Sequence, residues 1–518
     1  MSVQTPQSLR ARLNLDVRVN TRVVKIDTAK KNVTARDEST GAEAVISYDE
    51  LVLAVGAEPF KPPIPGIDRP GNFALRNLQD MDSIVGWIDK KQKALKDEKM
   101  HCIVAGAGFV GLEMVEQLLR RNMTVFVVEM MPQILGPLDP EMAAILERDL
   151  VDAGVNVVTG DAIKEIRQAV ASSDPEASEV VLGSGRVLPP SQMVILGLGV
   201  RPDTKMIADA GIPCTPRGHI VVDDEMKTSV ANVWAVGDAI EVNNPMLPDP
   251  EERWAVPLAG PANRQGRMVA DNIFLNAKRK YKGTYGASVV RMFKNIASCV
   301  GMNEKMLKAK GLPFESVHVH PGSHAGYFPG AKAINFKLIF NPQTGQIWGA
   351  QAVGEDGVEK RIDVIATAMQ GGMLVEDLAN LELCYAPPVG SAKDPVNMAG
   401  MAAQNLVEGL VTQVGTGART IQELLKDPQV KILDVRNPSE IEATGPIMEG
   451  AINIPLNDIR SRIDELDKDG KYVITCLSGQ RGYYAYRTLK QKGFKHIDNL
   501  SGAYKTWGHT LTRPSDAK

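Results

Sequence analysis

Residues 101–129, HCIVAGAGFVGLEMVEQLLRRNMTVFVVE, contain the pattern that decides the fold of this 518-residue chain. An apolar run leads into Gly106-x-Gly108-x-x-Gly111, and a helical segment follows. A second apolar run ends at Glu129, 18 residues after the third glycine. This order predicts a strand, a glycine-rich turn, a helix and a second strand, which is the first unit of a doubly wound α/β (Rossmann) domain.

These residue types suit the binding of a dinucleotide. Gly106 permits a tight turn, Gly108 lets the backbone approach a pyrophosphate, and Gly111 allows the helix to pack closely on the strand. The pyrophosphate would lie at the positive N-terminus of the helix. Glu129 would accept hydrogen bonds from ribose hydroxyls and repel a 2′-phosphate, which favours NADH over NADPH. A glycine-rich turn in another α/β fold is the alternative, and the complete context favours the nucleotide site.

The composition excludes several classes of protein. The 59 Lys+Arg and 62 Asp+Glu residues give a net charge of −3, which argues against a strongly basic nucleic-acid-binding surface. No run of about 18 apolar residues occurs, so we predict no membrane-spanning helix and no membrane partner. The five cysteines are too scattered for a disulfide framework and indicate a reducing compartment, so we expect a cytoplasmic protein. No metal site is predicted.

The remaining sequence divides into blocks of different character. Strand-rich segments flank the nucleotide-binding unit, a mixed α and β block follows, and a small α/β block ends the chain. A segment rich in Gly, Thr and Val precedes that last block and is expected to be a linker. The expected domains are 1–78, 79–215, 216–283, 284–410 and 420–518, with the linker at 411–419.

A second motif, TSVANVWAVGDA at 228–239, places Gly237 and Asp238 at the end of a buried strand. A carboxylate there could bond the hydroxyls of a sugar or a ribityl chain. A Gly-Asp pair after a strand is by itself more often a turn or a helix N-cap. The chain also contains the upstream segment YDELVLAVGAEP, at 48–59, and the two segments together make an ordinary turn at Gly237–Asp238 a less credible explanation.

Five segments in order resemble the pyridine nucleotide–disulfide oxidoreductase family of flavoproteins, which have two dinucleotide-binding domains. They are YDELVLAVGAEP, IVAGAGFVGLE, LGLGVRPDT, TSVANVWAVGDA and LAGPANRQGR. The resemblance implies an FAD domain formed by 1–78 and 216–283, and an NAD(H)-binding domain at 79–215. Residues implied to contact the cofactors include Gly199, Gly237, Asp238, Leu258 and Ala259, with Asp238 on the FAD ribitol.

The block at 284–410 resembles the family's α+β dimerisation domain, so the resemblance implies a homodimer. YFPGA, KRIDV and LCYAPPVGSAKDPVN are most similar to the coenzyme A disulfide reductase and NADH oxidase branch. In that branch two tyrosines approach the active site of the partner subunit, and they correspond to Tyr327 and Tyr385. Packing of two tyrosines with bonded hydroxyls is an equally good interpretation.

The last block independently resembles a rhodanese domain, through LDVRNPSE, EGAINIP and CLSGQRGYYA. Cys476 ends a predicted strand, and residues 477–481 form a loop that leads into a helix. Successive loop N–H groups and the helix N-terminus form an anion-binding nest that stabilises a thiolate or a persulfide. We therefore predict that Cys476 is catalytic and that Arg481 helps to bind an anionic sulfur donor. Cys102, Cys214, Cys299 and Cys384 are expected to be packing residues, although Cys384 beside Tyr385 retains a redox role as an alternative.

The sequence differs from the family in one respect. The family begins with its own glycine-rich strand–turn–helix for FAD and, in this branch, with a nucleophilic cysteine in an S-x-x-x-C-G stretch. Neither is found before residue 78, so about seventy residues are expected to be missing relative to the family, and the FAD domain is expected to be incomplete.

Three functional hypotheses follow. The first is an FAD-dependent, NADH-driven reductase of coenzyme A disulfide, a persulfide or a polysulfide, fused to a sulfurtransferase domain. The second is a rhodanese-type sulfurtransferase that carries a degenerate NADH-binding scaffold. The third is an NADH oxidase that acts on oxygen.

Overall fold

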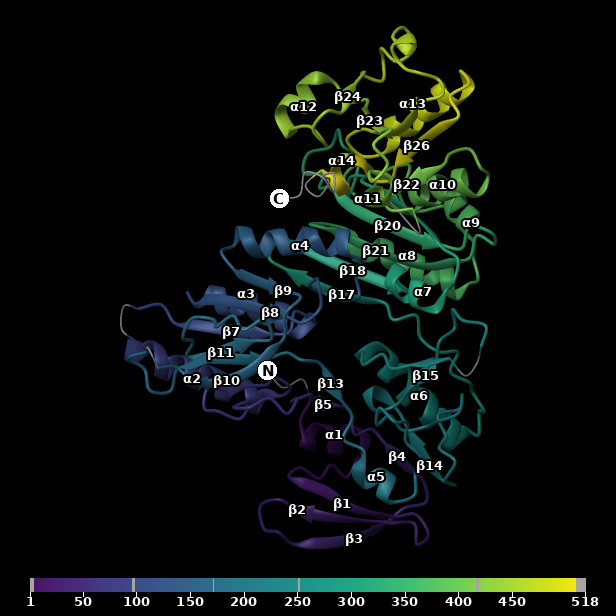
Figure 1. Ribbon diagram of the computed structural model, residues 1–518. Coiled ribbons are helices and arrows are strands. Elements are labelled where there is room, and N and C mark those ends of the chain that lie inside the picture. The colour runs from purple at the N-terminus through teal and green to yellow at the C-terminus, as the bar shows by residue number, and fades with distance from the viewer. Residues whose placement is uncertain (1–3, 96–97, 171, 250–251, 416–418, 509–518) are drawn as a thin grey trace. The chain divides into compact units, whose positions relative to one another are not determined.

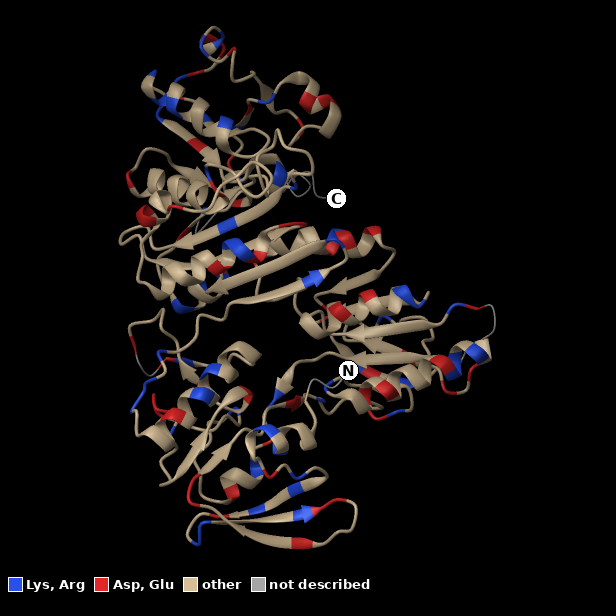
Figure 2. Cartoon of the chain, turned by 180° about the vertical axis from the view of Figure 1, so that it is seen from behind, with Lys and Arg blue, Asp and Glu red and all other residues tan. Residues whose placement is uncertain are grey.

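The computed structural model describes residues 4–95, 98–170, 172–249, 252–415 and 419–508 (Figure 1). Basic and acidic side chains are interspersed over the helices and strands (Figure 2), in keeping with the nearly balanced charge. Of the helices in the described ranges, none has the length and apolar character needed to span a bilayer. No cluster of His, Cys, Asp and Glu that could hold a metal ion occurs in these ranges either.

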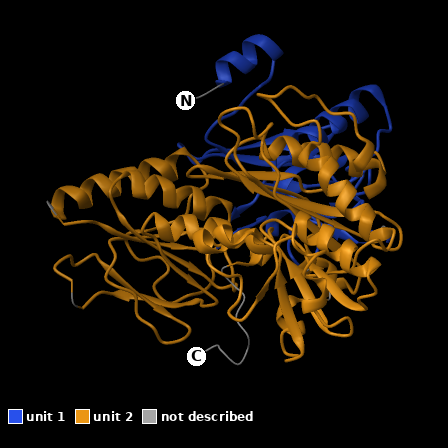
Figure 3. Ribbon diagram, turned by 90° about the horizontal axis from the view of Figure 1, so that it is seen from above, with its two compact units in different colours: residues 1–60, 199–284 blue, residues 61–198, 285–518 orange. Residues whose placement is uncertain are grey.

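The chain forms two compact units (Figure 3). Unit 1 consists of residues 1–60 and 199–284, and unit 2 of residues 61–198 and 285–518. The first and second divisions therefore fall near residues 60 and 198, not at 78 and 215 as expected. One reason is that β6 (Asn72–Phe73) pairs with β12 (Met193–Leu196) and so belongs to the nucleotide-binding sheet of unit 2.

Unit 1 is built from small sheets and a few helices, of which α6 is the longest. Strands β1, β2 and β3 form an antiparallel sheet, and β4 pairs in parallel with β14. Buried residues of β14 and α6 share one apolar core, which fixes the end of β14 beside α6. The elements are α1 (Pro6–Leu13), β1 (Thr21–Asp27), β2 (Asn32–Asp37), β3 (Glu43–Ser47), β4 (Leu51–Leu53), β5 (Glu58–Pro59), β13 (Val200–Arg201), α5 (Lys205–Asp209), β14 (Val233–Ala235), η1 (Gly237–Ala239), β15 (Val242–Asn243), β16 (Arg253–Trp254) and α6 (Ala259–Leu275).

The first part of unit 2 is the predicted doubly wound domain. Its five strands are all parallel, in the order β6-β12-β7-β8-β9. The central strand β7 is almost entirely buried, as expected for a parallel strand covered on both faces. Besides β6 and β12, the elements are α2 (Leu78–Leu95), β7 (His101–Ala105), α3 (Phe109–Arg120), β8 (Thr124–Glu129), α4 (Pro140–Asp152), β9 (Asn156–Thr159), β10 (Ile163–Gln168) and β11 (Ser178–Leu182).

The second part of unit 2 is an antiparallel sheet with helices, in the strand order β17-β18-β21-β20-β19. Strand β21 is buried along its whole length, because the sheet has neighbours on both faces. The elements are β17 (Ser288–Met292), β18 (Asn295–Gly301), α7 (Glu304–Lys310), β19 (Glu315–Val319), β20 (Ile334–Phe340), β21 (Ile347–Gly354), α8 (Val358–Gln370), α9 (Val375–Asn380) and α10 (Pro395–Val407).

The third part of unit 2 is a parallel sheet in the order β22-β26-β25-β23-β24. Two residues of the expected linker, Gln413 and Val414, form its edge strand β22, while residues 416–418 lie outside the described ranges. The elements are β22 (Gln413–Val414), α11 (Ile421–Leu424), β23 (Val430–Asp434), α12 (Pro438–Thr444), β24 (Ile452–Asn453), η2 (Ile463–Glu465), β25 (Lys471–Thr475), α13 (Gln480–Gln491), β26 (His496–Leu500) and α14 (Ala503–Trp507). The predicted α/β fold with a separate C-terminal α/β domain is confirmed.

Candidate functional sites

The glycine-rich turn lies between β7 and α3, where the sequence pattern predicts it. Gly106 has a φ of +94°, and a Cβ atom there would lie 2.3 Å from the carbonyl oxygen of Gly197. A Cβ atom on Gly111 would lie 2.0 Å from the carbonyl oxygen of Gly106. Gly108 is the N-cap of α3, and a Cβ atom there would meet nothing within 4 Å. The turn is therefore closed toward the sheet and open at the helix N-terminus, which suits a pyrophosphate.

Glu129 ends β8 beside this turn. One carboxylate oxygen accepts a hydrogen bond from the N–H of Ala107 at 2.8 Å, and the other accepts one from the N–H of Met131 at 2.8 Å. Both bonds fix the carboxylate at the edge where the ribose of a bound nucleotide would lie. The residues present therefore fit a pyridine nucleotide.

Two alanine substitutions separate packing from binding in this turn. Gly111→Ala should lower the free energy of unfolding by about 1–3 kcal/mol, because its Cβ would overlap backbone that cannot move aside. Gly108→Ala should keep wild-type stability, since its Cβ points into open space, but should weaken NADH binding by filling the space that the pyrophosphate needs. Chemical denaturation and titration of NADH against protein fluorescence measure the two effects. Equal losses of stability in the two variants would contradict this reading of the turn.

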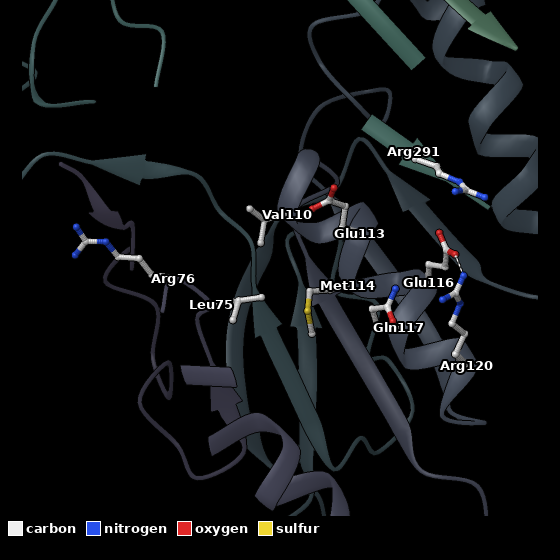
Figure 4. A pocket seen from close by; sticks show the side chains of 9 residues that line it. All are labelled: Leu75, Arg76, Val110, Glu113, Met114, Glu116, Gln117, Arg120 and Arg291. Carbon is white, nitrogen blue, oxygen red and sulfur yellow. Dashed lines mark hydrogen bonds and ion pairs between the residues drawn. The ribbon is translucent and has the colours of Figure 1, made fainter. Parts of the chain in front are cut away.

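A hollow of about 600 Å³ lies along the exposed side of α3 (Figure 4). Arg120 and Glu116 line the hollow and form an ion pair at 2.5 Å. Glu116 also accepts a hydrogen bond from the N–H of Phe293. The lining comes from the side chains of α3 and its neighbours, not from the three glycines or Glu129. The hollow is therefore not the predicted nucleotide site.

In unit 1 the Gly237–Asp238 pair lies where β14 ends and the short helix η1 begins. Gly237 has a φ of +79°, and its N–H donates to Oε1 of Gln265 on α6 at 2.8 Å. Leu258 is the N-cap of α6, and Ala259 is its first residue. The structure thus places Gly237, Asp238 and the start of α6 together, which fits the ribityl end of a flavin nucleotide. The described residues 4–60 contain no glycine-rich strand–turn–helix for its pyrophosphate.

Gly199 lies in a separate part of unit 1. Its φ is +89°, and its carbonyl oxygen accepts the N–H of Phe60 at 2.8 Å, next to the pairing of β13 with β5. This conformation accounts for a glycine at the position.

The two predicted tyrosines meet in the second part of unit 2. The hydroxyl oxygens of Tyr327 and Tyr385 lie 3.1 Å apart, and the side chains are 77% and 47% exposed. Their mutual hydrogen bond raises the pKa of Tyr327 above its ordinary value. This exposure in the single chain leaves both hydroxyl groups accessible to another molecule, such as a partner subunit.

Cys476 follows β25 directly and is fully buried. The N–H of Gly479 donates to its Sγ atom at 3.1 Å, and Gly479 has a φ of +96° as the N-cap of α13. Helix α14 stabilises the loop, because the N–H groups of Tyr504 and Lys505 donate to the carbonyl oxygens of Cys476 and Leu477. The structure therefore forms the predicted loop, with a backbone donor directed at the sulfur.

Arg481, one residue into α13, forms a two-pronged ion pair with Glu440 of α12, at 2.6 and 2.7 Å. Glu440 is also bound by the N–H of Asn437 at 3.0 Å. The motif LDVRNPSE contains Glu440 but does not itself predict a role for it. Its spacing from Asn437 signals a helix N-terminus, whereas the contact with Arg481 spans 41 positions and has no local signal.

The other four cysteines differ in exposure. Cys102 is buried, and its burial raises the thiol pKa well above the ordinary range. Burial also raises the pKa of Cys299, which contacts Ser288, while Cys214 is half-buried. These three agree with a packing role. Cys384 is exposed, so the expectation that it packs in a core is wrong.

Comparisons with known proteins cover the whole architecture. Residues 4–266 match the family described as pyridine nucleotide-disulphide oxidoreductase, and residues 288–395 match its dimerisation domain. Residues 418–510 match the rhodanese-like domain. The chain belongs to the pyridine nucleotide-disulphide oxidoreductase family.

Relatives within this family support the assignment along most of the chain. An NADH oxidase of Methanocaldococcus jannaschii is 33% identical over 77% of this chain and 84% of its own length. A coenzyme A disulfide reductase of Staphylococcus aureus is 31% identical over 77% of this chain and 86% of its own.

Two solved structures include the rhodanese part. The reduced CoADR-RHD of Bacillus anthracis is 42% identical, has a TM-score of 0.90, and matches over 98% of this chain and 87% of its own. The NAD-dependent persulfide reductase from A. fulgidus is 33% identical, has a TM-score of 0.87, and matches over 98% and 88%. The predicted oxidoreductase fused to a rhodanese domain is thereby confirmed. Family membership implies a flavin and a pyridine nucleotide as cofactors, and the dimerisation domain indicates a homodimer.

Proposed function

We propose that this protein uses NADH and FAD to reduce the sulfur–sulfur bond of coenzyme A disulfide, a persulfide or a polysulfide, and that its rhodanese domain carries sulfane sulfur on Cys476. The observation that carries the proposal is the hydrogen bond from Gly479 N–H to Cys476 Sγ, in a chain that also has the nucleotide turn of β7 and α3. Relatives named coenzyme A disulfide reductase and persulfide reductase support the class of substrate.

Each cofactor has its own set of residues. Gly106, Gly108, Gly111 and Glu129 would hold NADH, and the fixed carboxylate of Glu129 supports NADH over NADPH. Gly237, Asp238, Leu258 and Ala259 would hold FAD, and Gly199 would contact one of the two bound cofactors. Bound flavin would supply a relay for the electron pair between the nicotinamide and the sulfur–sulfur bond.

The chain's own residues bind and orient sulfur. Tyr327 and Tyr385, exposed and hydrogen-bonded to each other, would meet the substrate at the active site of the second copy in a homodimer. The Cys476 thiolate would attack the terminal sulfur of a persulfide R–S–SH. The donor's S–S bond breaks, a new S–S bond forms on Cys476, and R–S⁻ leaves. The cradle of loop N–H groups would stabilise the anionic sulfur of either state.

We further propose that the protein works in the cytoplasm, with small sulfur compounds as its substrates. Its five cysteines are free, and no disulfide occurs in the described residues. A reducing compartment keeps both the Cys476 thiol and a coenzyme A-type thiol acceptor available.

The test is NADH consumption by the purified full-length chain after incubation with FAD. We expect faster oxidation of NADH than of NADPH, stimulation by coenzyme A persulfide or coenzyme A disulfide, and little stimulation by oxygen alone. NADH consumption that depends on oxygen and ignores the sulfur compounds would favour an NADH oxidase. Protein that retains no flavin and oxidises no NADH, but transfers sulfur, would reduce the function to the sulfurtransferase.

A further inference from the structure

The charges around Cys476 are paired within the third part of unit 2. Both guanidinium branches of Arg481 bind Glu440, and the two side chains are 30% and 27% exposed. These hydrogen bonds lower the pKa of Glu440 to about 2, so its carboxylate is ionised at neutral pH. Arg481 is the single charged residue among residues 477–481 and lies two positions after Gly479, whose N–H donates to Sγ of Cys476.

The second arginine of this region is neutralised as well. Arg436 is fully buried, and its guanidinium binds the carboxylate of Asp434 at 2.6 Å and stacks on the ring of Tyr504 at 4.4 Å. Asp434 and Arg436 flank the end of β23, next to β25, which Cys476 follows directly. The two arginines and two carboxylates therefore sum to zero charge. The backbone N–H groups, and Lys393 on the wall of the pocket next to Ser478 and Gly479, remain as local attractions for an anion.

This charge balance distinguishes between classes of sulfur donor. A small oxyanion donor such as thiosulfate brings two negative charges close to the attacking sulfur. The Glu440 carboxylate repels these charges, and because it binds the Arg481 guanidinium, that cation does not attract them. A persulfide on a thiol carrier brings at most one charge at the reacting sulfur, and any further charges lie far away along the carrier. With Arg481 neutralised, the site disfavours a persulfide on a thiol carrier much less than it disfavours thiosulfate.

We propose that Glu440 is a specificity-determining residue of the sulfurtransferase site, which selects persulfides of thiol carriers against doubly charged oxyanion donors by neutralising Arg481. The inference rests on the proposed role of Cys476 as the thiol that accepts sulfur. With either donor the Cys476 thiolate attacks the outer sulfur and the donor's S–S bond breaks. The leaving group is sulfite in the case of thiosulfate and the carrier thiolate in the case of a persulfide, and Cys476 becomes a persulfide in both.

The test compares kcat/KM for thiosulfate and for glutathione persulfide, with cyanide as the common acceptor, in the full chain. Glu440→Gln removes the charge and retains an oxygen for the Asn437 N–H. The ratio of thiosulfate to persulfide activity should rise about tenfold or more in this variant. Glu442→Gln removes an equal charge from an exposed position of the same helix, so its ratio should match the wild type. An unchanged ratio in Glu440→Gln, or an equal rise in Glu442→Gln, would overturn the proposal.

A measurement on the unaltered protein gives an independent answer if Glu440→Gln does not fold. The rates at which iodoacetamide and iodoacetate alkylate Cys476 are compared by mass spectrometry of its peptide, in the folded and the urea-unfolded chain. If Glu440 neutralises Arg481, folding should not increase the rate of alkylation by the anionic iodoacetate relative to that by iodoacetamide. A marked increase in this ratio would contradict the proposal. Cys476→Ser distinguishes a failure of the proposed role of Cys476 from a failure of the proposed role of Glu440. If that variant still transfers sulfur, the proposed function fails; if it does not, an unchanged donor ratio in Glu440→Gln refutes only the role of Glu440.

Discussion

Replacing Lys337 by methionine should lower the free energy of unfolding by about 3–5 kcal/mol. The Nζ atom of Lys337 on β20 lies 2.9 Å from Asp139, 2.5 Å from Glu141 and 2.9 Å from Glu304, and the lysine is 1% exposed. Methionine fills a similar volume but leaves three buried carboxylates next to one another without their shared cation. The cost of uncompensated buried charge is large, in contrast to the small value of most surface ion pairs.

The same cluster joins the three parts of unit 2, so its loss should reach beyond β20. Glu141 lies in the first turn of α4 of the nucleotide-binding domain, and its Oε1 atom lies 3.0 Å from Nε2 of His318 on β19. Nδ1 of His318 lies 3.1 Å from the hydroxyl oxygen of Ser501, in the rhodanese-like domain. We therefore expect Lys337→Met to loosen both neighbouring domains, which limited proteolysis would detect as earlier cleavage.

The loss of unfolding free energy in Lys337→Met should depend on pH and become smaller in acid. Burial alone would raise the pKa of Glu141, but the charge of Lys337 and the contacts of His318 outweigh burial and hold that pKa below its ordinary value. Burial acts against the charge of Lys337, and the three carboxylates outweigh it and raise the pKa of the lysine. A lowered carboxylate pKa stabilises the fold above about pH 4.3, and a raised lysine pKa stabilises it below about pH 10.4. The full contribution therefore lies between about pH 5 and 10, and the difference between variant and wild type should shrink as the pH falls below about 4.

Denaturant titrations at several pH values measure this difference. Lys332→Met is the matched control, because Lys332 forms a surface pair with Glu355 at 2.8 Å and is half exposed. Its effect should be small at every pH. If the two variants lost the same stability at neutral pH, the cluster would not have the role that its burial implies.

The contrast between Lys337 and the glycine turn shows what could be predicted from sequence. Gly111 and Glu129 interact with backbone within a short βαβ unit, so their spacing already contains the geometry. Lys337 lies in the segment AINFKLIF, which reads as an apolar strand, and its partners come from two distant segments. No local pattern could bring those carboxylates to the lysine.

The sulfurtransferase site is intermediate between these cases. The order of strand, loop and helix predicted the surroundings of Cys476, because the loop N–H groups follow from local backbone. The charge state of the site could not be predicted in this way. Arg481 was expected to be available for an anionic donor, and the structure instead pairs it with Glu440, which the chain reaches only by placing α12 next to α13. Tertiary packing, not residue type, decided that difference.

Cys476→Ser should abolish sulfur transfer, with a loss of about 10³-fold or more in the rate of thiocyanate formation from a persulfide and cyanide. A serine hydroxyl is a far weaker nucleophile than a thiolate at neutral pH and cannot hold sulfane sulfur. The fold should persist, because serine is slightly smaller than cysteine and its Oγ atom can accept the N–H of Gly479. Cys384→Ser changes an exposed cysteine elsewhere in unit 2 and should retain the wild-type rate. Mass spectrometry after treatment with a persulfide should find one added sulfur on the Cys476 peptide of the wild type, and the absence of that adduct together with an active Cys476→Ser variant would refute the assignment.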